Sequence, residues 1–137
     1  MSQVKVVPPM YVAQIWDKVE HYLKSALNHS GGEYNIEHLK QYLVQGNQVL
    51  LIAIDENDNI HGAMTIQWDN FPNERIAFIT TFGGKMVTDK DLWNQLETWV
   101  RQNGGTAMRG AVRKAVARYA ERLFGFKSQY IITEKKL

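Results

Sequence analysis

Three consecutive strand-like runs in the middle of the chain constrain its fold more than any other feature. Residues 49–54 are continuously apolar, as in a strand that is buried on both faces. After a polar turn at residues 55–59, residues 60–68 alternate between two kinds of side chain, which is the period of a strand with two distinct faces. A second turn, at residues 70–73, leads into Arg75–Phe82. The sequence therefore predicts an antiparallel meander of three strands.

Helical periodicity flanks this meander on both sides. Ahead of it, the spacing of apolar residues predicts a helix over residues 11–29 that ends at residues 30–32, and Asn35 is suited to cap a second, shorter helix. Behind it, one amphipathic helix begins near Asp89, and a basic helix over residues 112–124 stops at a glycine. Four helices are therefore expected around the strands.

Shorter apolar runs supply the remaining strands, which we expect at residues 4–7, 106–111 and 129–133. Strand, helix and strand follow one another between Arg75 and Ala111, and such a crossover favours a parallel pair. Because the meander is antiparallel, the sheet should be mixed. We expect one α/β domain over residues 1–137, with a mixed central sheet of about six to seven strands and helices on both faces.

The absence of cysteine excludes several kinds of site. The chain cannot form disulfides, thiolate metal sites or a cysteine nucleophile. Its four histidines have no metal-ligand spacing, so no metal is expected. A hydrophobic content of 45%, a charged content of 22% and the lack of any run of membrane-spanning length are typical of a soluble protein, which we expect to be cytoplasmic.

Charge is distributed unevenly along the chain. Residues 1–69 hold 4 Lys and Arg against 8 Asp and Glu, which gives −4, whereas residues 70–137 hold 12 against 6, which gives +6. The basic half indicates either an anionic partner or a solvated helix face. Of the anionic partners, a nucleotide cofactor is favoured over a nucleic acid.

The third strand of the meander is followed by Gly83, Gly84 and Lys85, and then by a helix. Glycine lets the backbone approach a ligand closely, and a helix start is electropositive. Such a stretch can leave backbone N–H groups directed at an anion. A plain turn is the alternative.

The order of these elements, closed by a helix that ends at Phe124-Gly125-Phe126, resembles the GCN5-related N-acetyltransferase superfamily over nearly the whole chain. Several short motifs further resemble small acetyltransferase-like proteins encoded by bacteriophages. These motifs are Ile15-Trp16, residues 43–46, residues 60–63, Gly83-Gly84, residues 93–99, and Gly104 followed by Arg109-Gly110 and Arg113.

The resemblance implies an acetyl-CoA site on the third strand of the meander. In the superfamily this strand splays from its neighbour, and its exposed backbone pairs with the pantetheine arm. The positions that would face the arm in this chain are Ile79, Thr80, Thr81 and Phe82, and those that would face the pyrophosphate are Gly83, Gly84 and Lys85. Arg113 and its basic neighbours would meet the 3′-phosphate.

The chain departs from the superfamily at the pyrophosphate site. The Gln/Arg-x-x-Gly-x-Gly/Ala signature is absent. Asp89 and Asp91 stand at the helix start, where phosphate would approach. The departure weakens the expectation of tight acetyl-CoA binding.

Candidate catalytic and acceptor-binding residues are few. Many superfamily members place a tyrosine general acid four residues before the final Gly-Phe, and this chain has Glu121 there, with Tyr119 two residues earlier. A glutamate would serve as an acid only in a buried environment, and a surface charge is the alternative. His61 is a candidate base, against a core or surface histidine. Trp68 and Asp69, at the end of the same strand, are candidates for the acceptor site.

These expectations lead to one function and one alternative. The chain would transfer an acetyl group from acetyl-CoA to a small amine or a protein amine by direct attack, with positioning supplying most of the rate. The alternative is an inactive scaffold with the same fold, such as a phage virion component or an inhibitor of a host protein. If the chain is phage-encoded, its location would be the host cytoplasm or the virion.

Overall fold

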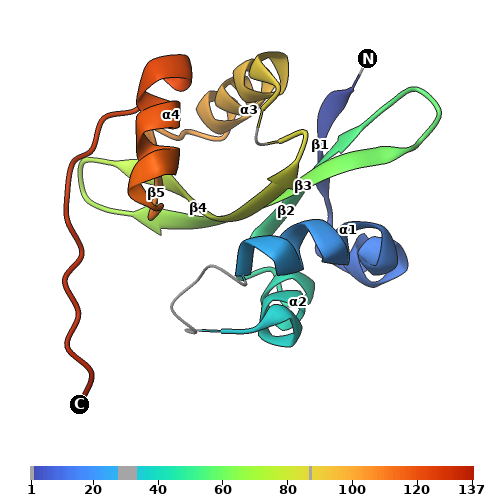
Figure 1. Cartoon of the computed structure of the whole chain (residues 1–137). Coiled ribbons are helices and arrows are strands. Elements are labelled where there is room, and N and C mark those ends of the chain that lie inside the picture. Colours follow the sequence, from blue (N-terminus) through green and yellow to red (C-terminus); the bar gives the residue numbers. More distant parts are fainter. Residues whose placement is uncertain (1, 28–33, 87) are drawn as a thin grey trace.

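A twisted five-stranded sheet lies at the centre of the computed structural model, which describes residues 2–27, 34–86 and 88–137 (Figure 1). Its strands follow one another across the sheet in chain order, and all neighbours are antiparallel except the last pair, which is parallel. The strands are β1 Gln3–Val7, β2 Val49–Ile54, β3 Ile60–Asn70, β4 Arg75–Gly84 and β5 Ala107–Gly110. The predicted meander and the mixed sheet are confirmed.

Helices cover both faces of this sheet, as predicted (Figure 1). On one face lie α1 Val12–Leu27, preceded by a short 3-10 helix, and α2 Ile36–Val44. On the other face lie α3 Lys90–Gln102 and α4 Lys114–Phe124. The expected end of the first helix, at residues 30–32, lies outside the described residues.

Two helix ends have the local chemistry that the sequence indicates. The side chain of Asn35 accepts a 3.0 Å hydrogen bond from the backbone N–H of His38, so Asn35 caps α2 as predicted. Gly125 ends α4 with a φ of 73°, a conformation that glycine adopts at little cost. At α3 the cap is Asp89, one residue beyond the Thr88 at which a capping pattern begins.

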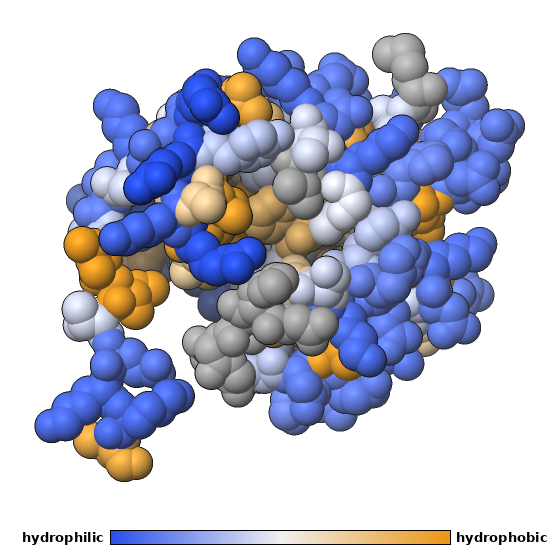
Figure 2. Space-filling model, viewed as in Figure 1, coloured by the Kyte–Doolittle hydropathy of each residue, from blue (hydrophilic) through white to orange (hydrophobic). Residues whose placement is uncertain are grey.

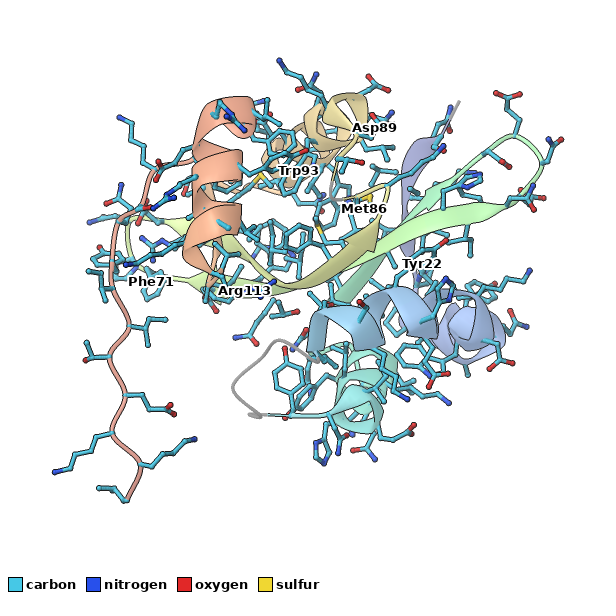
Figure 3. The ribbon with its side chains drawn as sticks, in the orientation of Figure 1. Tyr22, Phe71, Met86, Asp89, Trp93 and Arg113 are labelled. Carbon is cyan, nitrogen blue, oxygen red and sulfur yellow. The ribbon has the colours of Figure 1, made fainter. Side chains whose placement is uncertain are left out.

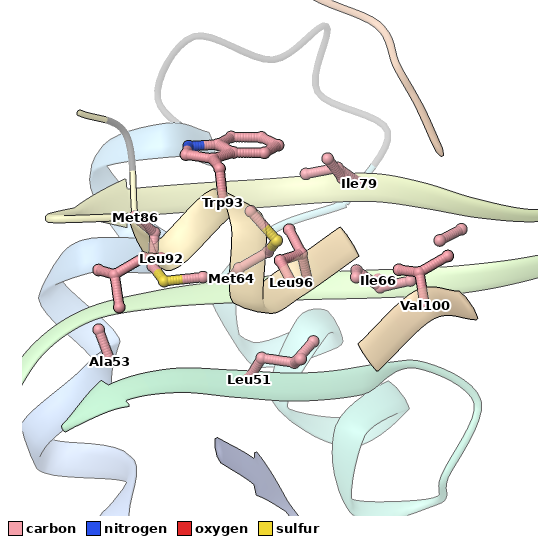
Figure 4. Packing of buried hydrophobic residues seen from close by; sticks show 11 residues of the cluster. Leu51, Ala53, Met64, Ile66, Ile79, Met86, Leu92, Trp93, Leu96 and Val100 are labelled. Carbon is pink, nitrogen blue, oxygen red and sulfur yellow. The ribbon is translucent and has the colours of Figure 1, made fainter. Parts of the chain in front are cut away.

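Apolar side chains form one core on each face of the sheet. Under α3, residues of β2, β3 and β4 pack against the helix (Figure 4), and the labelled members of this cluster are Leu51, Ala53, Met64, Ile66, Ile79, Met86, Leu92, Trp93, Leu96 and Val100. Under α1 and α2, the alternate residues of β2 and β3 pack against the helices, among them Leu50, Ile52 and Ala63. The two cores therefore pack against β2 and β3 from both sides.

The expected final strand at residues 129–133 is absent, and the sheet has five strands, not the six to seven predicted. Residues 125–137 form an extended chain whose end stands clear of the body (Figure 2). Ile131 is 91% exposed there. The β-branched and aromatic residues of this segment favour a strand. A strand also needs a neighbouring strand to form hydrogen bonds with, and this segment has none in the described structure.

No helix in the described parts of the chain has the length and apolar character needed to cross a membrane.

Candidate active site

β4 and β5 separate from each other part of the way along β4. Their parallel pairing runs from Ile76 opposite Ala107 to Ile79 opposite Gly110, where β5 ends. The rest of β4, residues 80–84, has no strand on that side in the described structure. An unpaired strand edge exposes backbone N–H and C=O groups to a ligand. We refer to the point between Ile79 and Gly110 as the fork.

A β-bulge lies at the fork. In the pairing of β3 with β4, Thr65 faces Thr81 and Ile66 faces Ile79, so Thr80 is the extra residue. Thr80 therefore has no register partner in β3 or in β5 among the described residues. Bulges of this kind redirect backbone and side-chain groups at the place where a strand leaves its ladder.

A polar network connects the bulge to the interior. The Oγ1 of Thr80 donates to the side-chain oxygen of Gln48 at 2.7 Å, and it lies 2.6 Å from the Oγ1 of Thr65. The hydroxyl of Thr65 also bonds to that of Thr81. Gln48 is 5% exposed, Thr65 0% and Thr81 3%. Buried polar groups need such mutual hydrogen bonds, so the network fixes the bulge in one arrangement.

A pocket of about 290 Å³ opens beside this network on the face that α1 and α2 cover. Its described lining consists of Tyr34, Tyr42, Asn47, Gln48 and Gln67, none of which carries a charge. Gln48 is nearly buried, and its side-chain oxygen accepts the hydrogen bond from Thr80. Because Gln48 also lines the pocket, it connects the pocket to the fork.

Sequence reasoning missed Gln48, Thr65 and this pocket. Their only signal was the position of two polar residues next to, or within, runs that are otherwise apolar. Thr80 belongs to the site because of the bulge, and the pattern of side chains in the sequence does not predict this bulge.

Gly83 and Gly84 belong to β4 and do not form a turn beyond it. They pair with Ala63 and Gly62 of β3. A Cβ on Gly83 would lie 2.5 Å from the backbone oxygen of Tyr22, which comes from α1 (Figure 3), and one on Gly84 would collide with the backbone oxygen of His61. Close packing against the chain itself therefore requires both glycines.

The segment after these glycines bonds mostly to itself. The N–H of Lys85 donates to His61 at 2.9 Å, and the N–H groups of Thr88 and Asp89 donate to the backbone oxygen of Lys85. At the start of α3, Asp89 (Figure 3) accepts from the N–H groups of Asp91 and Leu92 at 2.9 and 3.3 Å. These amides are not available to a pyrophosphate.

His61 lies at the hairpin end of β3, beside the end of β4. Its Nε2 is 2.7 Å from the carboxylate of Asp55 in the β2–β3 turn. This hydrogen bond, together with backbone donors at Asn59 and Asn57, lowers the pKa of Asp55 to about 2. His61 is thus held by a local hydrogen bond to Asp55.

The other predicted acceptor-site residues lie at the far end of β3. Trp68 is seven residues from His61, or about 23 Å along a strand. The guanidinium of Arg75 stacks 3.8 Å from the centre of the Trp68 ring, and Trp99 packs beside the ring at 5.7 Å. Asp69 accepts a hydrogen bond from Gln67, which lines the pocket. The structure does not bring His61 and Trp68 into one site.

The candidates on α4 differ in their surroundings. Glu121 is exposed and accepts a 2.6 Å hydrogen bond from the hydroxyl of Ser128. Tyr119 is half-buried, with its ring edge-on to Phe124 at 5.8 Å. Arg113 is exposed at the start of α4 (Figure 3), three residues after the end of β5 at the fork.

An aromatic cluster closes the space between α3, α4 and β4. Trp93 stacks on Phe124 at 4.7 Å and meets Phe82 and Phe126 edge-on. Its indole N–H is buried without a hydrogen-bond partner among the described residues. Phe82, one of the residues expected to face the pantetheine, therefore directs its side chain into this cluster.

Comparison with known proteins identifies the fold of the chain but not its family. No protein-family model and no curated protein matches the sequence. Solved structures match over nearly the whole chain. One, described as a probable acetyltransferase, has a TM-score of 0.70 and 14% identity and covers 98% of this chain and 95% of its own.

Two further matches are aminoglycoside acetyltransferases. One comes from an uncultured soil metagenomic sample and was solved with sisomicin, with a TM-score of 0.69, 14% identity and coverage of 99% and 96%. The other is a 6′-N-acetyltransferase from Acinetobacter baumannii, with a TM-score of 0.62, 12% identity and coverage of 100% and 99%. The chain thus has the fold of GCN5-related N-acetyltransferases, as predicted.

Proposed function

We propose that this protein transfers an acetyl group from a pantetheine thioester, such as that of acetyl-CoA, to an amine. The observation that carries the proposal is the fork, where β4 leaves β5 and presents the unpaired backbone of residues 80–84. Acetyltransferases of the same fold, among them enzymes that act on aminoglycosides, support the reaction class.

The chain's own groups suggest how it would position the reactants. Acetyl-CoA, when bound, would supply a thioester: an amine nitrogen attacks its carbonyl carbon, the C–N bond forms, the C–S bond breaks, the leaving thiolate takes up one proton, and the amine nitrogen releases one to the solvent. The unpaired edge of β4 would hold the amides of the pantetheine arm as an added strand does. The bulge at Thr80, fixed by Gln48 and Thr65, would orient the thioester at the fork.

The amine would enter from the opposite face, through the pocket next to Gln48. The side-chain amide of Gln48 lines this pocket and would contact the acceptor, and the pocket is linked to Thr80 by the bond from Thr80 to Gln48. Donor and acceptor would then meet at the bulge from two sides of the sheet. Tyr119, which is half-buried on α4, is the residue we propose as the proton donor to the leaving thiolate, and its hydroxyl would regain a proton from the solvent.

The fit to the whole of acetyl-CoA is incomplete. The fork suits the arm, but in the segment that follows β4 the N–H groups of Lys85, Thr88, Asp89, Asp91 and Leu92 already donate to acceptors of the chain itself. The same segment favours the alternative function, a scaffold that has lost the cofactor. Binding of the donor therefore decides between the two.

The deciding experiment is a calorimetric titration with acetyl-CoA of the wild type and of two variants at Gly110. A Cβ at Gly110 would have no atom nearer than 3.8 Å, so alanine fits the fold there, and an unchanged circular dichroism spectrum would show that phenylalanine is tolerated too. Gly110→Phe should fill the fork and abolish binding, whereas Gly110→Ala should retain it. If the wild type binds no acetyl-CoA, the scaffold becomes the better description; if Gly110→Phe binds as the wild type does, the site lies elsewhere.

A further inference from the structure

We infer that this protein recognises its acyl donor through the pantetheine arm and not through the diphosphate of a nucleotide. The inference rests on the proposed function and specifies which part of the donor the chain can hold. The ligand class is an S-acyl-pantetheine, whatever is attached to the far end of its arm. Three features of the segment between β4 and α3 lead to this conclusion.

The first feature is the hydrogen bonding of the segment. A diphosphate site at a helix start needs free backbone N–H groups. Here the N–H of Lys85 bonds to His61 at 2.9 Å, and those of Thr88 and Asp89 bond to the oxygen of Lys85 at 3.3 and 3.1 Å. These N–H groups thus donate to the backbone of β3 or to the backbone of the segment itself.

The second feature is the carboxylate at the start of α3. Asp89 accepts from the N–H groups of Asp91 and Leu92, at the position where a phosphate oxygen would accept. Asp91 adds a second negative charge in the first turn. Lys85 and Lys90 only balance the two carboxylates, so the segment has no surplus of positive charge to set against a diphosphate.

The third feature is the use made of the two glycines. At a diphosphate site, glycines leave room for the ligand to approach the backbone. In this chain the room beside Gly83 holds the backbone of Tyr22, and the room beside Gly84 holds the backbone of His61 and the ring of Tyr22. The two glycines therefore allow β4 to pack closely against β3 and α1.

The fork has none of these obstacles. Residues 80–84 of β4 have no described strand beside them on the β5 side, and the bulge at Thr80 is held by side chains and not by a second ladder. The fork therefore suits an arm that carries amides and a thioester, whereas the bonded amides and the carboxylates described after β4 do not suit a diphosphate.

The test compares two donors by calorimetry on the full chain. S-acetyl-pantetheine carries the arm alone, and acetyl-dephospho-CoA adds the diphosphate and the adenosine but not the 3′-phosphate, so that Arg113 does not enter the comparison. We expect their dissociation constants to agree within about threefold. A more than about tenfold preference for acetyl-dephospho-CoA would show that the nucleotide end of the donor contributes to recognition and would overturn the inference, although the proposed function would stand.

Failure of the two proposals can be told apart. If neither donor binds, the proposed function fails, and the inference fails with it. If both bind alike, both proposals gain support.

A variant of the helix start gives an independent readout. Asp89→Gly removes the charge and frees the amides of Asp91 and Leu92, and glycine remains tolerable as a cap. It should tighten acetyl-dephospho-CoA at least about fivefold and leave S-acetyl-pantetheine unchanged. Asp91→Asn is the matched control, because it removes a charge and frees no amide. Equal effects of Asp89→Gly on both donors, with an unchanged circular dichroism spectrum, would contradict the inference.

Discussion

The hydroxyl of Thr80 donates a 2.7 Å hydrogen bond to the side-chain oxygen of Gln48, which precedes the first strand of the meander by one residue. Thr80 is the bulged residue of β4 and lacks a register partner in both neighbouring strands. The side-chain bond thus replaces part of the missing ladder. It couples the geometry of the fork to the wall of the pocket, so the two halves of the proposed site depend on one contact.

Replacing Thr80 by valine should destabilise the protein by about 1–2 kcal/mol. Valine keeps the shape of the side chain but removes the donor, which leaves the nearly buried oxygen of Gln48 without its partner. The free energy of unfolding from urea melts measures the effect. Thr98→Val is the control, since the hydroxyl of Thr98 is exposed on α3 and bonds to its own helix. Equal losses in the two variants would show that the contact with Gln48 adds nothing.

Replacing Gly83 by alanine should cost about 1–3 kcal/mol of stability, because the added Cβ would lie 2.5 Å from the backbone oxygen of Tyr22. Gly110→Ala is the matched control within the same sheet. Its Cβ would have 3.8 Å of space, and the change should stay within about 0.5 kcal/mol. A Gly83→Ala protein as stable as the wild type would mean that α1 can move away from β4.

Much of this fold is contained in local patterns. The continuous apolar run over β2 and the alternation along β3 predicted both strands, since burial on one face or two fixes the period of the side chains. Asn35 and Gly125 predicted two helix ends because capping depends on neighbouring residues alone. Helix and strand positions were therefore accessible without tertiary information.

The parts that were missed depend on contacts between distant segments. Gly83 and Gly84 indicated either an anion-binding stretch or a plain turn, yet their neighbours are Tyr22 and His61, which no local pattern connects with them. The bulge at Thr80 follows from the registers of two ladders. Residues 129–133 have the composition of a strand, but pairing requires a partner, and composition does not supply one.

Deleting residues 131–137 should change the free energy of unfolding by less than about 0.5 kcal/mol. Ile131 and Ile132 are 91% and 77% exposed, so their removal takes almost nothing from the core. Phe126→Ala provides the contrast, because the ring of Phe126 meets Trp93 at 5.8 Å, and its loss should cost about 1–2 kcal/mol. A large loss on deletion would indicate that the tail pairs with the sheet in solution.

The hydrogen bond between Asp55 and His61 predicts a specific acid sensitivity. The hydrogen bond from His61 lowers the pKa of Asp55 from its ordinary value of 3.8 to about 2 in the folded protein. A depressed pKa means that the carboxylate stabilises the fold fully above the unfolded value and that this contribution is lost as the pH falls from about 4 towards 2.

Asp55→Asn should therefore lose less stability than the wild type when urea melts at about pH 5 and about pH 2.5 are compared. Asparagine cannot titrate, so this part of the acid dependence disappears, while both proteins share the rest. Asp58→Asn is the control in the same turn, because asparagine tolerates the φ of 63° found there. The control should follow the wild type. If Asp55→Asn and the wild type lose the same stability over this interval, the contact with His61 does not hold the carboxylate in solution.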